Sequence, residues 1–207
     1  FISTEMPVGI DYQAGVSAQL KSAVILAGLN SYGITKITEK EKSRDHTENM
    51  LSTNVKAIKI KKAKENLIKI YGKRQLKPLS TSIPGDPSSA SFFTALTLLN
   101  KGSSLKIKNV GLNPTRNGFY QLLKKQGAKI KFKNLKKINN ELRGDIIVNS
   151  CKLKPIRASK SYYTNMTDEY PILFVMAALI KGTSSFKGIN DLTNKESNRI
   201  LEMQKIL

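Results

Sequence analysis

Three arginines stand in short polar segments that we expect to open helices: Arg44, Arg116 and Arg199. The first turn of a helix presents unpaired N–H donors and a partial positive charge, which together bind phosphate and carboxylate groups. An arginine there opposes the helix dipole and costs stability unless an anion lies beside it. Each arginine taken alone could pair with a surface carboxylate such as Asp45 or Glu196. Their recurrence in three such segments favours ligands that carry phosphate.

Two other segments combine polar groups with a predicted helix start. Ser17-Ala18-Gln19 opens an apolar segment with a hydroxyl and an amide, although Ser17 could serve simply as an N-cap. Asp168 lies just before Pro171, and an acid followed by proline is typical of a first helical turn. Asp168 and Glu196 are candidate carboxylates for acid–base chemistry, which would require burial or charged neighbours to tune the pKa of each.

Other common catalytic arrangements are missing from the sequence. The chain has one histidine, His46, and one cysteine, Cys151, which excludes a disulfide framework and most histidine-based metal sites. No histidine lies near Cys151 in the sequence, and we expect it to pack as a small apolar residue. Neither a glycine-rich dinucleotide fingerprint nor a Walker loop is present. We therefore expect no metal site.

The elements that must position these side chains recur along the chain. An apolar helix, a glycine and a short strand follow one another in residues 17–37, 88–107 and 170–186. The glycines come directly after the predicted helices, where a left-handed backbone favours glycine. They are Gly33, Gly102 and Gly182. Each strand then leads into one of the polar segments that contain an arginine.

Two further strands follow each of the first two arginine segments. We expect them at 57–61 and 67–71, and at 129–132 and 145–148. The predicted unit is β-α-β-α-β-β, repeated about two and a half times. Its first helix is expected inside and its sheet outside, because that helix is apolar nearly all round. On periodicity alone, a plain two-layer α/β sandwich is the alternative.

The densest cluster of proline, glycine and serine, residues 80–89, marks the best candidate for a domain boundary, near Gly85. The chain begins at Phe1 rather than at methionine, and its last residues lie inside a helical pattern without a stop signal. We therefore expect the sequence to be a segment of a longer protein.

The composition narrows the class of partner. The 207 residues carry 35 basic and 15 acidic side chains, a formal net charge of +20, which attracts polyanions. Few of the basic residues are arginine, the better ligand of phosphate and base edges, and the lysines are spread along the whole chain. We therefore expect a solvated lysine surface rather than a nucleic-acid site. No apolar run approaches the ~20 residues of a membrane span and no secretion signal opens the chain, which predicts a cytoplasmic protein.

Six motifs cover most of the chain: residues 17–29 (SAQLKSAVILAGL), 43–51 (SRDHTENML), 84–90 (PGDPSSA), 113–118 (NPTRNG), 168–171 (DEYP) and 195–199 (KESNR). In this order they resemble the 5-enolpyruvylshikimate-3-phosphate (EPSP) synthase family. The resemblance implies a mixed α/β (α+β) fold, an inside-out α/β barrel of repeated βαβαββ units, with two domains that close over the active site. It also implies that residues 1–83 and 84–207 are parts of these two domains, within a central fragment that lacks both ends.

The resemblance further implies the reaction. The enolpyruvyl group of phosphoenolpyruvate moves to the 5-hydroxyl of shikimate 3-phosphate and phosphate is released, a step of the shikimate pathway to chorismate and the aromatic amino acids. Neither a metal nor an organic cofactor is implied, and the partners are these two small anions rather than nucleic acid or membrane. We expect a cytoplasmic monomer, and an isolated fragment that is inactive.

The resemblance assigns roles in the second half of the chain residue by residue. Asp168 matches the family aspartate that contacts the 5-hydroxyl and is taken as its proton acceptor. Glu196 matches the glutamate taken as proton donor to the methylene carbon of phosphoenolpyruvate. Lys195 matches a lysine that contacts shikimate 3-phosphate, and Arg199 matches an arginine that binds phosphoenolpyruvate.

The other implied contacts lie in the first half. Ser17, Ala18 and Gln19 match a segment at the shikimate 3-phosphate, and Gln19 also reaches phosphoenolpyruvate. Arg44 matches an arginine of the same pocket.

The last motif departs from the family pattern, because an arginine, a valine and an aspartate usual in relatives are replaced here. The residues found instead are Thr193, Asn194 and Asn198. A catalytically incomplete homologue is therefore one alternative. A UDP-N-acetylglucosamine enolpyruvyl transferase is another, although its reactive cysteine loop has no counterpart in this sequence, and a basic nucleic-acid-binding module is the third.

Overall fold

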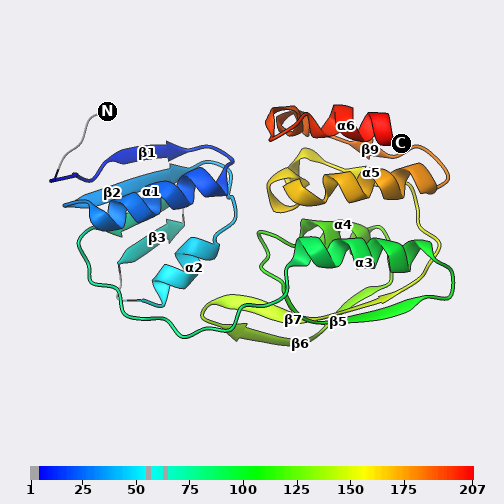
Figure 1. Ribbon diagram of the computed structural model, residues 1–207, viewed down its shortest axis with the longest axis horizontal. Coiled ribbons are helices and arrows are strands. Elements are labelled where there is room, and N and C mark those ends of the chain that lie inside the picture. Colours follow the sequence, from blue (N-terminus) through cyan, green and yellow to red (C-terminus); the bar gives the residue numbers. More distant parts are fainter. Residues whose placement is uncertain (1–4, 55–56, 63–64) are drawn as a thin grey trace. The chain divides into compact units, whose positions relative to one another are not determined.

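The computed structural model of the chain describes residues 5–54, 57–62 and 65–207 (Figure 1). They form two compact units. Unit 1 comprises the described residues up to Ser82 together with Ile138–Glu141, and unit 2 comprises Ile83–Lys137 and Leu142–Leu207. None of the helices in the described ranges is both long and apolar enough to cross a lipid bilayer.

Unit 1 contains one complete copy of the predicted repeat. Its elements are β1 (Asp11–Ala14), α1 (Ala18–Asn30), β2 (Ile34–Glu39), α2 (His46–Ser52), β3 (Ile58–Lys62) and β4 (Asn66–Tyr71). The sheet has the order β1-β2-β4-β3, with β1 and β2 parallel and the other pairs antiparallel. Ile25 and Leu29 of α1 are buried with Ile37, Ile68 and Ile70 of the sheet, so the helix and the sheet share one apolar core.

The second repeat has the same strand order. Its elements are α3 (Pro87–Leu99), β5 (Ser104–Gly111), α4 (Gly118–Lys125), β6 (Ile130–Ile138) and β7 (Glu141–Asn149). The order is β5-β7-β6, and a parallel bridge between Gly85 and Val110 takes the place that the β1–β2 pair has in unit 1. Asn139 and Asn140 join β6 to β7 with φ angles of +49° and +63°, as a tight type I′ hairpin turn requires.

The third repeat consists of shorter elements. They are β8 (Arg157–Ala158), the 3₁₀ helices η1 (Lys160–Asn165) and η2 (Thr167–Glu169), α5 (Tyr170–Leu179), β9 (Ser185–Phe186), the 3₁₀ helix η3 (Asn190–Asn194) and α6 (Arg199–Ile206). Strands β8 and β9 are parallel, like β1 and β2. The predicted α/β class and the β-α-β-α-β-β order are thus confirmed.

The residues that end the first helix of each repeat follow the same pattern. Gly33, Gly102 and Gly182 have φ angles of +82°, +80° and +110°, which confirms the predicted left-handed backbone. Each glycine lies two residues beyond the C-cap rather than directly after the helix, because the C-cap residue itself remains extended.

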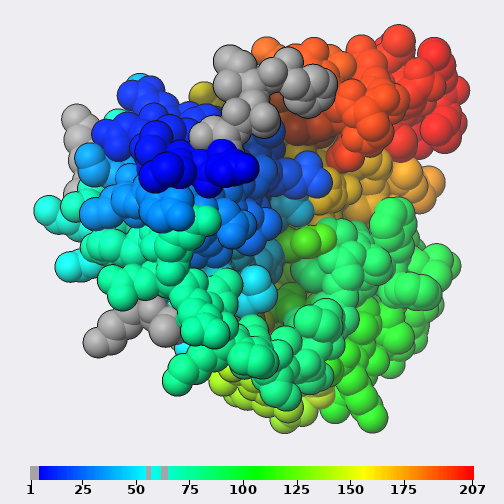
Figure 2. All heavy atoms as spheres, turned by 60° about the vertical axis from the view of Figure 1, so that its left-hand side comes forward, coloured from blue at the N-terminus to red at the C-terminus, as the bar shows by residue number. Residues whose placement is uncertain are grey.

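Helix α3 is apolar on two sides. Ala95 and Leu98 are buried in the core of unit 2, whereas Phe92, Phe93 and Leu96 are each more than half exposed. Figure 2 shows the green segment that contains α3 at the surface. The helix therefore packs against its own sheet with one face only, among the residues that the structure describes.

A carboxylate stabilises an irregular strand pair in unit 2. Strand β5 carries a bulge between Ile107 and Val110, where Asn109 has a φ of +52°. Asp145 of β7 accepts hydrogen bonds from the Asn109 N–H at 3.0 Å and from Asn134 Nδ2 at 2.8 Å. These bonds and an ion pair with Lys106 at 3.0 Å lower the pKa of Asp145 to about 2.

Replacing Asp145 by asparagine should therefore destabilise the protein in a pH-dependent way. A carboxyl whose pKa is lower in the folded state than in the unfolded state stabilises the fold above the unfolded value, which is 3.8 here. This contribution declines as the pH falls from about 4 toward 2. Urea unfolding should show a large difference between the two proteins at pH 7 and a smaller one at pH 3. A constant difference would contradict the prediction, and Asp11→Asn at an exposed aspartate of β1 is the control.

Candidate active site

The predicted site residues divide between the two units. Each group lies at the first turn of a helix or within a few residues before it, near N–H donors and a helix dipole that favour anions. In unit 1 they are Ser17, Ala18, Gln19 and Arg44, and in unit 2 they are Asp168, Lys195, Glu196 and Arg199.

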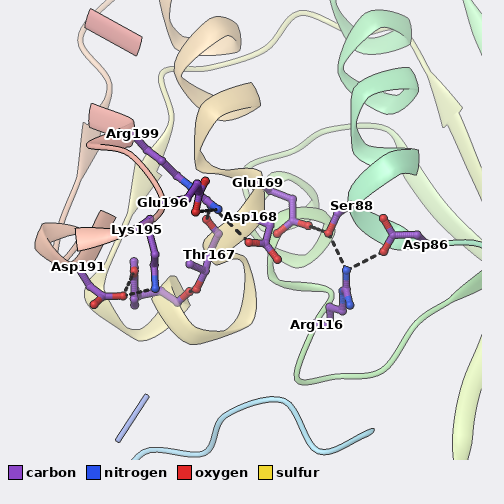
Figure 3. A network of polar contacts seen from close by, with 11 residues as sticks. Asp86, Ser88, Arg116, Thr167, Asp168, Glu169, Asp191, Lys195, Glu196 and Arg199 are labelled. Atoms are coloured by element: carbon purple, nitrogen blue, oxygen red, sulfur yellow. Dashed lines mark hydrogen bonds and ion pairs between the residues drawn. The ribbon is translucent and has the colours of Figure 1, made fainter. Parts of the chain in front are cut away.

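Arg199 connects the two candidate catalytic carboxylates of unit 2 (Figure 3). It is the first residue of α6, and its guanidinium donates to both oxygens of Glu196, at 2.8 and 3.1 Å. On its other side, Arg199 Nη1 lies 3.4 Å from Asp168 Oδ1. Asp168 belongs to the 3₁₀ turn that leads into α5, so the starts of two helices meet at this arginine. The predicted carboxylates therefore lie within reach of one guanidinium.

The pKa values of Glu196 and Arg199 shift in the directions that an ion pair produces. The hydrogen bonds from Arg199 lower the pKa of Glu196 below its usual value, although this side chain is 69% exposed. The same contact raises the pKa of Arg199, and Asp168 adds to the rise. Glu196 is consequently ionised at neutral pH in this arrangement.

A cavity of about 490 Å³ lies beside this group. Its wall is formed by the beginnings of α3, α5 and α6, so polar groups and helix N-termini from three elements converge on it. Asp168, Glu196 and Arg199 all belong to this wall, and Phe92 and Met203 add apolar surface. Such a mixture of charged and apolar groups can hold a small anion.

Arg116 and residues at the starts of α3 and α5 extend the polar network at this site (Figure 3). Asp86, the N-cap of α3, accepts a hydrogen bond from the Ser89 N–H and pairs with Arg116 at 2.7 Å. The N–H and hydroxyl of Ser89 and the Arg116 guanidinium outweigh the effect of burial, and the pKa of Asp86 is lowered. Ser88 donates a short hydrogen bond to Glu169, which is buried next to Asp168. This network therefore joins the start of α3 to the segment that carries Asp168.

Arg116 was expected to favour a phosphate ligand, whereas the sequence predicted no functional role for Asp86, Ser88, Ser89 or Glu169. Asp86, Ser88 and Ser89 belong to the motif at 84–90, whose proline and glycine marked it as a domain boundary rather than as part of a site. The N-cap signal of Asp86 ahead of Pro87 is visible in the sequence. Its place on the same cavity wall as Asp168 depends on the packing of α3 against α5, which no local signal contains.

Lys195 is placed differently from the other predicted residues of unit 2. Its Nζ lies 2.6 Å from Asp191 Oδ2, four residues earlier, and the pair lies to one side of the Asp168 group in Figure 3. Lys195 does not line the cavity in the described part of the chain. Binding of a substrate by Lys195 would therefore require it to exchange Asp191 for the new anion.

In unit 1, the start of α1 has the predicted capping. The Leu20 N–H donates to Ser17 Oγ at 3.4 Å, and Gln19 is exposed in the first turn.

The predicted position of two of the three arginines, in the first turn of a helix, was wrong. Arg44 and Arg116 each lie two residues before the first residue of a helix, α2 or α4, and only Arg199 lies in a first turn.

The side-chain contacts that make each helix start after its arginine differ between the two segments. Asn113 Oδ1 accepts from the Thr115 N–H and hydroxyl, both at 2.8 Å, and this side-chain turn delays the start of α4. Ser43 is held by the side chain of Glu39, which delays the start of α2.

Among the residues that the structure describes, no three carboxylate, histidine or cysteine side chains cluster as a metal site would require.

The chain is similar to known proteins over almost its whole length. A model of the family EPSP synthase (3-phosphoshikimate 1-carboxyvinyltransferase) matches residues 4–207. A curated 3-phosphoshikimate 1-carboxyvinyltransferase of Zymomonas mobilis is 42% identical over 201 residues, 95% of this chain and 44% of the relative. One from Aquifex aeolicus is 41% identical over 186 residues, 89% of this chain and 43% of the relative. The chain thus spans less than half the length of these relatives.

Solved structures show the same similarity. An EPSP synthase from Acinetobacter baumannii matches with a TM-score of 0.83 and 36% identity, over 97% of this chain and 45% of that one. The enolpyruvyl transferase NikO from Streptomyces tendae matches with a TM-score of 0.62 and 16% identity, over 87% of this chain and 44% of that one. The second match is a likeness of fold alone.

Proposed function

Because the chain belongs to the EPSP synthase family, we propose that the whole protein transfers the enolpyruvyl group of phosphoenolpyruvate to the 5-hydroxyl of shikimate 3-phosphate, with release of phosphate. The observation that carries the proposal is the position of Arg199 between Asp168 and Glu196 on the wall of one cavity. Two carboxylates beside a guanidinium supply the proton acceptor, the proton donor and an anion-binding group that this transfer needs.

The two carboxylates have opposite tasks in this proposal. The 5-hydroxyl must lose a proton when it attacks, and Asp168 accepts it because an ionised carboxylate is a pure acceptor. The methylene carbon of phosphoenolpyruvate must gain a proton, and Glu196 donates it. A donor must first be protonated, whereas the pairing with Arg199 lowers the pKa of Glu196.

Substrate binding itself resolves this conflict. The carboxylate or phosphate of phosphoenolpyruvate competes for the Arg199 guanidinium and so weakens its hydrogen bonds to Glu196. Loss of these bonds and of solvent raises the pKa of Glu196 toward the range in which it can hold a proton. The free protein therefore keeps its acid ionised, and the donor substrate prepares it for protonation.

The remaining predicted residues bind the second anion. Ser17, Ala18 and Gln19 at the start of α1 and Arg44 before α2 take the phosphate end of shikimate 3-phosphate, and Lys195 exchanges Asp191 for the same substrate. We propose that residues 1–83 and 84–207 are parts of two domains that close on the substrates and exclude water. The protein is proposed to be a cytoplasmic monomer without metal or organic cofactor, and without nucleic-acid or membrane partners.

A coupled phosphate-release assay on the full-length protein tests the proposal. We expect turnover that requires both phosphoenolpyruvate and shikimate 3-phosphate, and none from residues 1–207 alone, because they span less than half the length of the relatives that they match. Shikimate without its phosphate is the control acceptor and should react poorly, since its anionic anchor is missing. Phosphate release that is independent of the acceptor would refute the proposed transfer.

A further inference from the structure

Lys21 is an unusual residue in the core of unit 1. This lysine of α1 is 0% exposed, and its Nζ lies 2.9 Å from Glu39 Oε1 and 2.7 Å from Glu48 Oε1. Both glutamates are 2% exposed. Three ionisable groups from α1, the end of β2 and α2 are thus buried together, beneath the segment that contains Arg44.

Stability alone is a poor explanation for such a group. Removing charges from water costs several kcal/mol for each ion, and well-packed apolar residues often replace a buried ion pair without loss. A charged hydrogen-bonded group differs from an apolar one in fixing directions and distances between the elements that it joins. The residues that hydrogen-bond to Glu39 therefore indicate the role of the buried Lys21, Glu39 and Glu48 group.

Glu39 holds the residue immediately before Arg44. Its Oε1 accepts hydrogen bonds from the Ser43 N–H at 2.8 Å and from the Ser43 hydroxyl at 2.6 Å. Ser43 is 1% exposed, so these bonds lie out of competition with water. Lys21 Nζ donates to the same oxygen of Glu39 at 2.9 Å. The backbone on one side of Arg44 is thereby tied to α1, four residues after its N-cap Ser17.

The residue on the other side of Arg44 is also held. Asp45 is the N-cap residue of α2, and its carbonyl accepts the Asn49 N–H at 2.9 Å. Its carboxylate pairs with Lys42 at 2.6 Å. Arg44 therefore lies between two anchored neighbours, although it is itself in a loop.

We infer that Glu39, held by Lys21, is a positioning residue that sets the place of Arg44 relative to the start of α1, and so governs the affinity for the phosphorylated acceptor. The inference rests on the proposed function, because it takes Arg44 and the start of α1 as parts of one anion site. Glu39 acts through Ser43 and does not itself touch substrate, since it is buried beneath the loop.

The test uses steady-state kinetics of the full-length protein carrying Glu39→Gln or Ser43→Ala, each with Arg44 present and in an Arg44→Ala background. With Arg44 present, we expect each change to raise the KM for shikimate 3-phosphate about tenfold with kcat nearly unchanged. In the Arg44→Ala background the same changes should leave KM where Arg44→Ala alone puts it. Ser43→Ala keeps the backbone bond to Glu39, so it still tests the inference if Glu39→Gln does not fold.

Ser52→Ala is the matched control. Ser52 is an exposed residue of α2 whose hydroxyl donates to the Asn49 carbonyl at 2.8 Å, and its loss should leave both constants unchanged. If the unaltered protein turns over and Ser43→Ala leaves KM unchanged, or raises it equally without Arg44, the inference is overturned while the proposed function stands. If the unaltered protein does not turn over the two substrates, both are overturned.

Discussion

Replacing either Asp168 by alanine or Glu196 by glutamine in the full-length protein should lower kcat by about 10²- to 10⁴-fold, the usual contribution of a positioned acid or base. Asp168 and Glu196 lie on opposite sides of Arg199, so each can serve a different proton transfer. Because the two substrates remain bound through their other anionic groups, KM should change much less than kcat. The coupled phosphate-release assay measures both constants.

The change of kcat must come from chemistry and not from unfolding. Both side chains are at least a third exposed, so the variants should melt within a few degrees of the unaltered protein. Asp11→Asn removes an exposed carboxylate of β1 and is the control with full activity. Turnover that is unchanged in both site variants would mean that neither carboxylate moves a proton in the reaction.

The largest expected effect on stability is that of Lys21→Met, which should lower the free energy of unfolding by about 3–5 kcal/mol. Methionine fills a similar volume but leaves the carboxylates of Glu39 and Glu48 buried without their cation. Urea unfolding monitored by circular dichroism measures the loss. Lys36→Met, at a lysine of β2 that is 44% exposed and pairs with Asp11, should change the same quantity by less than about 0.5 kcal/mol.

The loss caused by Lys21→Met should also depend on pH. Burial already raises the pKa of Glu48, and the hydrogen bond from Lys21 works against that rise. Without the lysine, the pKa of Glu48 in the folded state rises further. The loss in the free energy of unfolding is therefore smallest at low pH and grows as the pH rises through that pKa. A deficit that is smaller at pH 5 than at pH 8 is therefore expected. An equal deficit at both values would show that lost packing, and not uncompensated charge, is responsible.

The repeat was predictable because its signals are local. An apolar helix between a cap such as Ser17 and a glycine such as Gly33 contains its own start and stop, and the strand after it alternates in polarity. The same holds for the second copy with Asp86 and Gly102. The order in which the strands pair was not predicted, because it depends on contacts between segments far apart in the sequence.

The placement of charged side chains was less predictable. Lys21 stands in an apolar helix, where a lysine would ordinarily face solvent, and its partner Glu39 lies 18 residues away. Nothing in the sequence distinguishes this pair from any other lysine and glutamate. Lys195 pairs with Asp191 one helical turn earlier, and that contact competes with the role assigned by resemblance. The partner of each charged side chain is determined by tertiary packing and by competition among nearby charges. A sequence motif contains no information on either.

The strand ladders have a consequence for how this architecture can change over evolutionary time. Among the residues that the structure describes, the strands pair into three separate sheets, one in each repeat. An exchange of genetic material between repeats would therefore cut loops and leave every main-chain ladder intact. The sheets can also accumulate different sequences independently, so that one copy specialises in recognition and another in chemistry while the common topology persists.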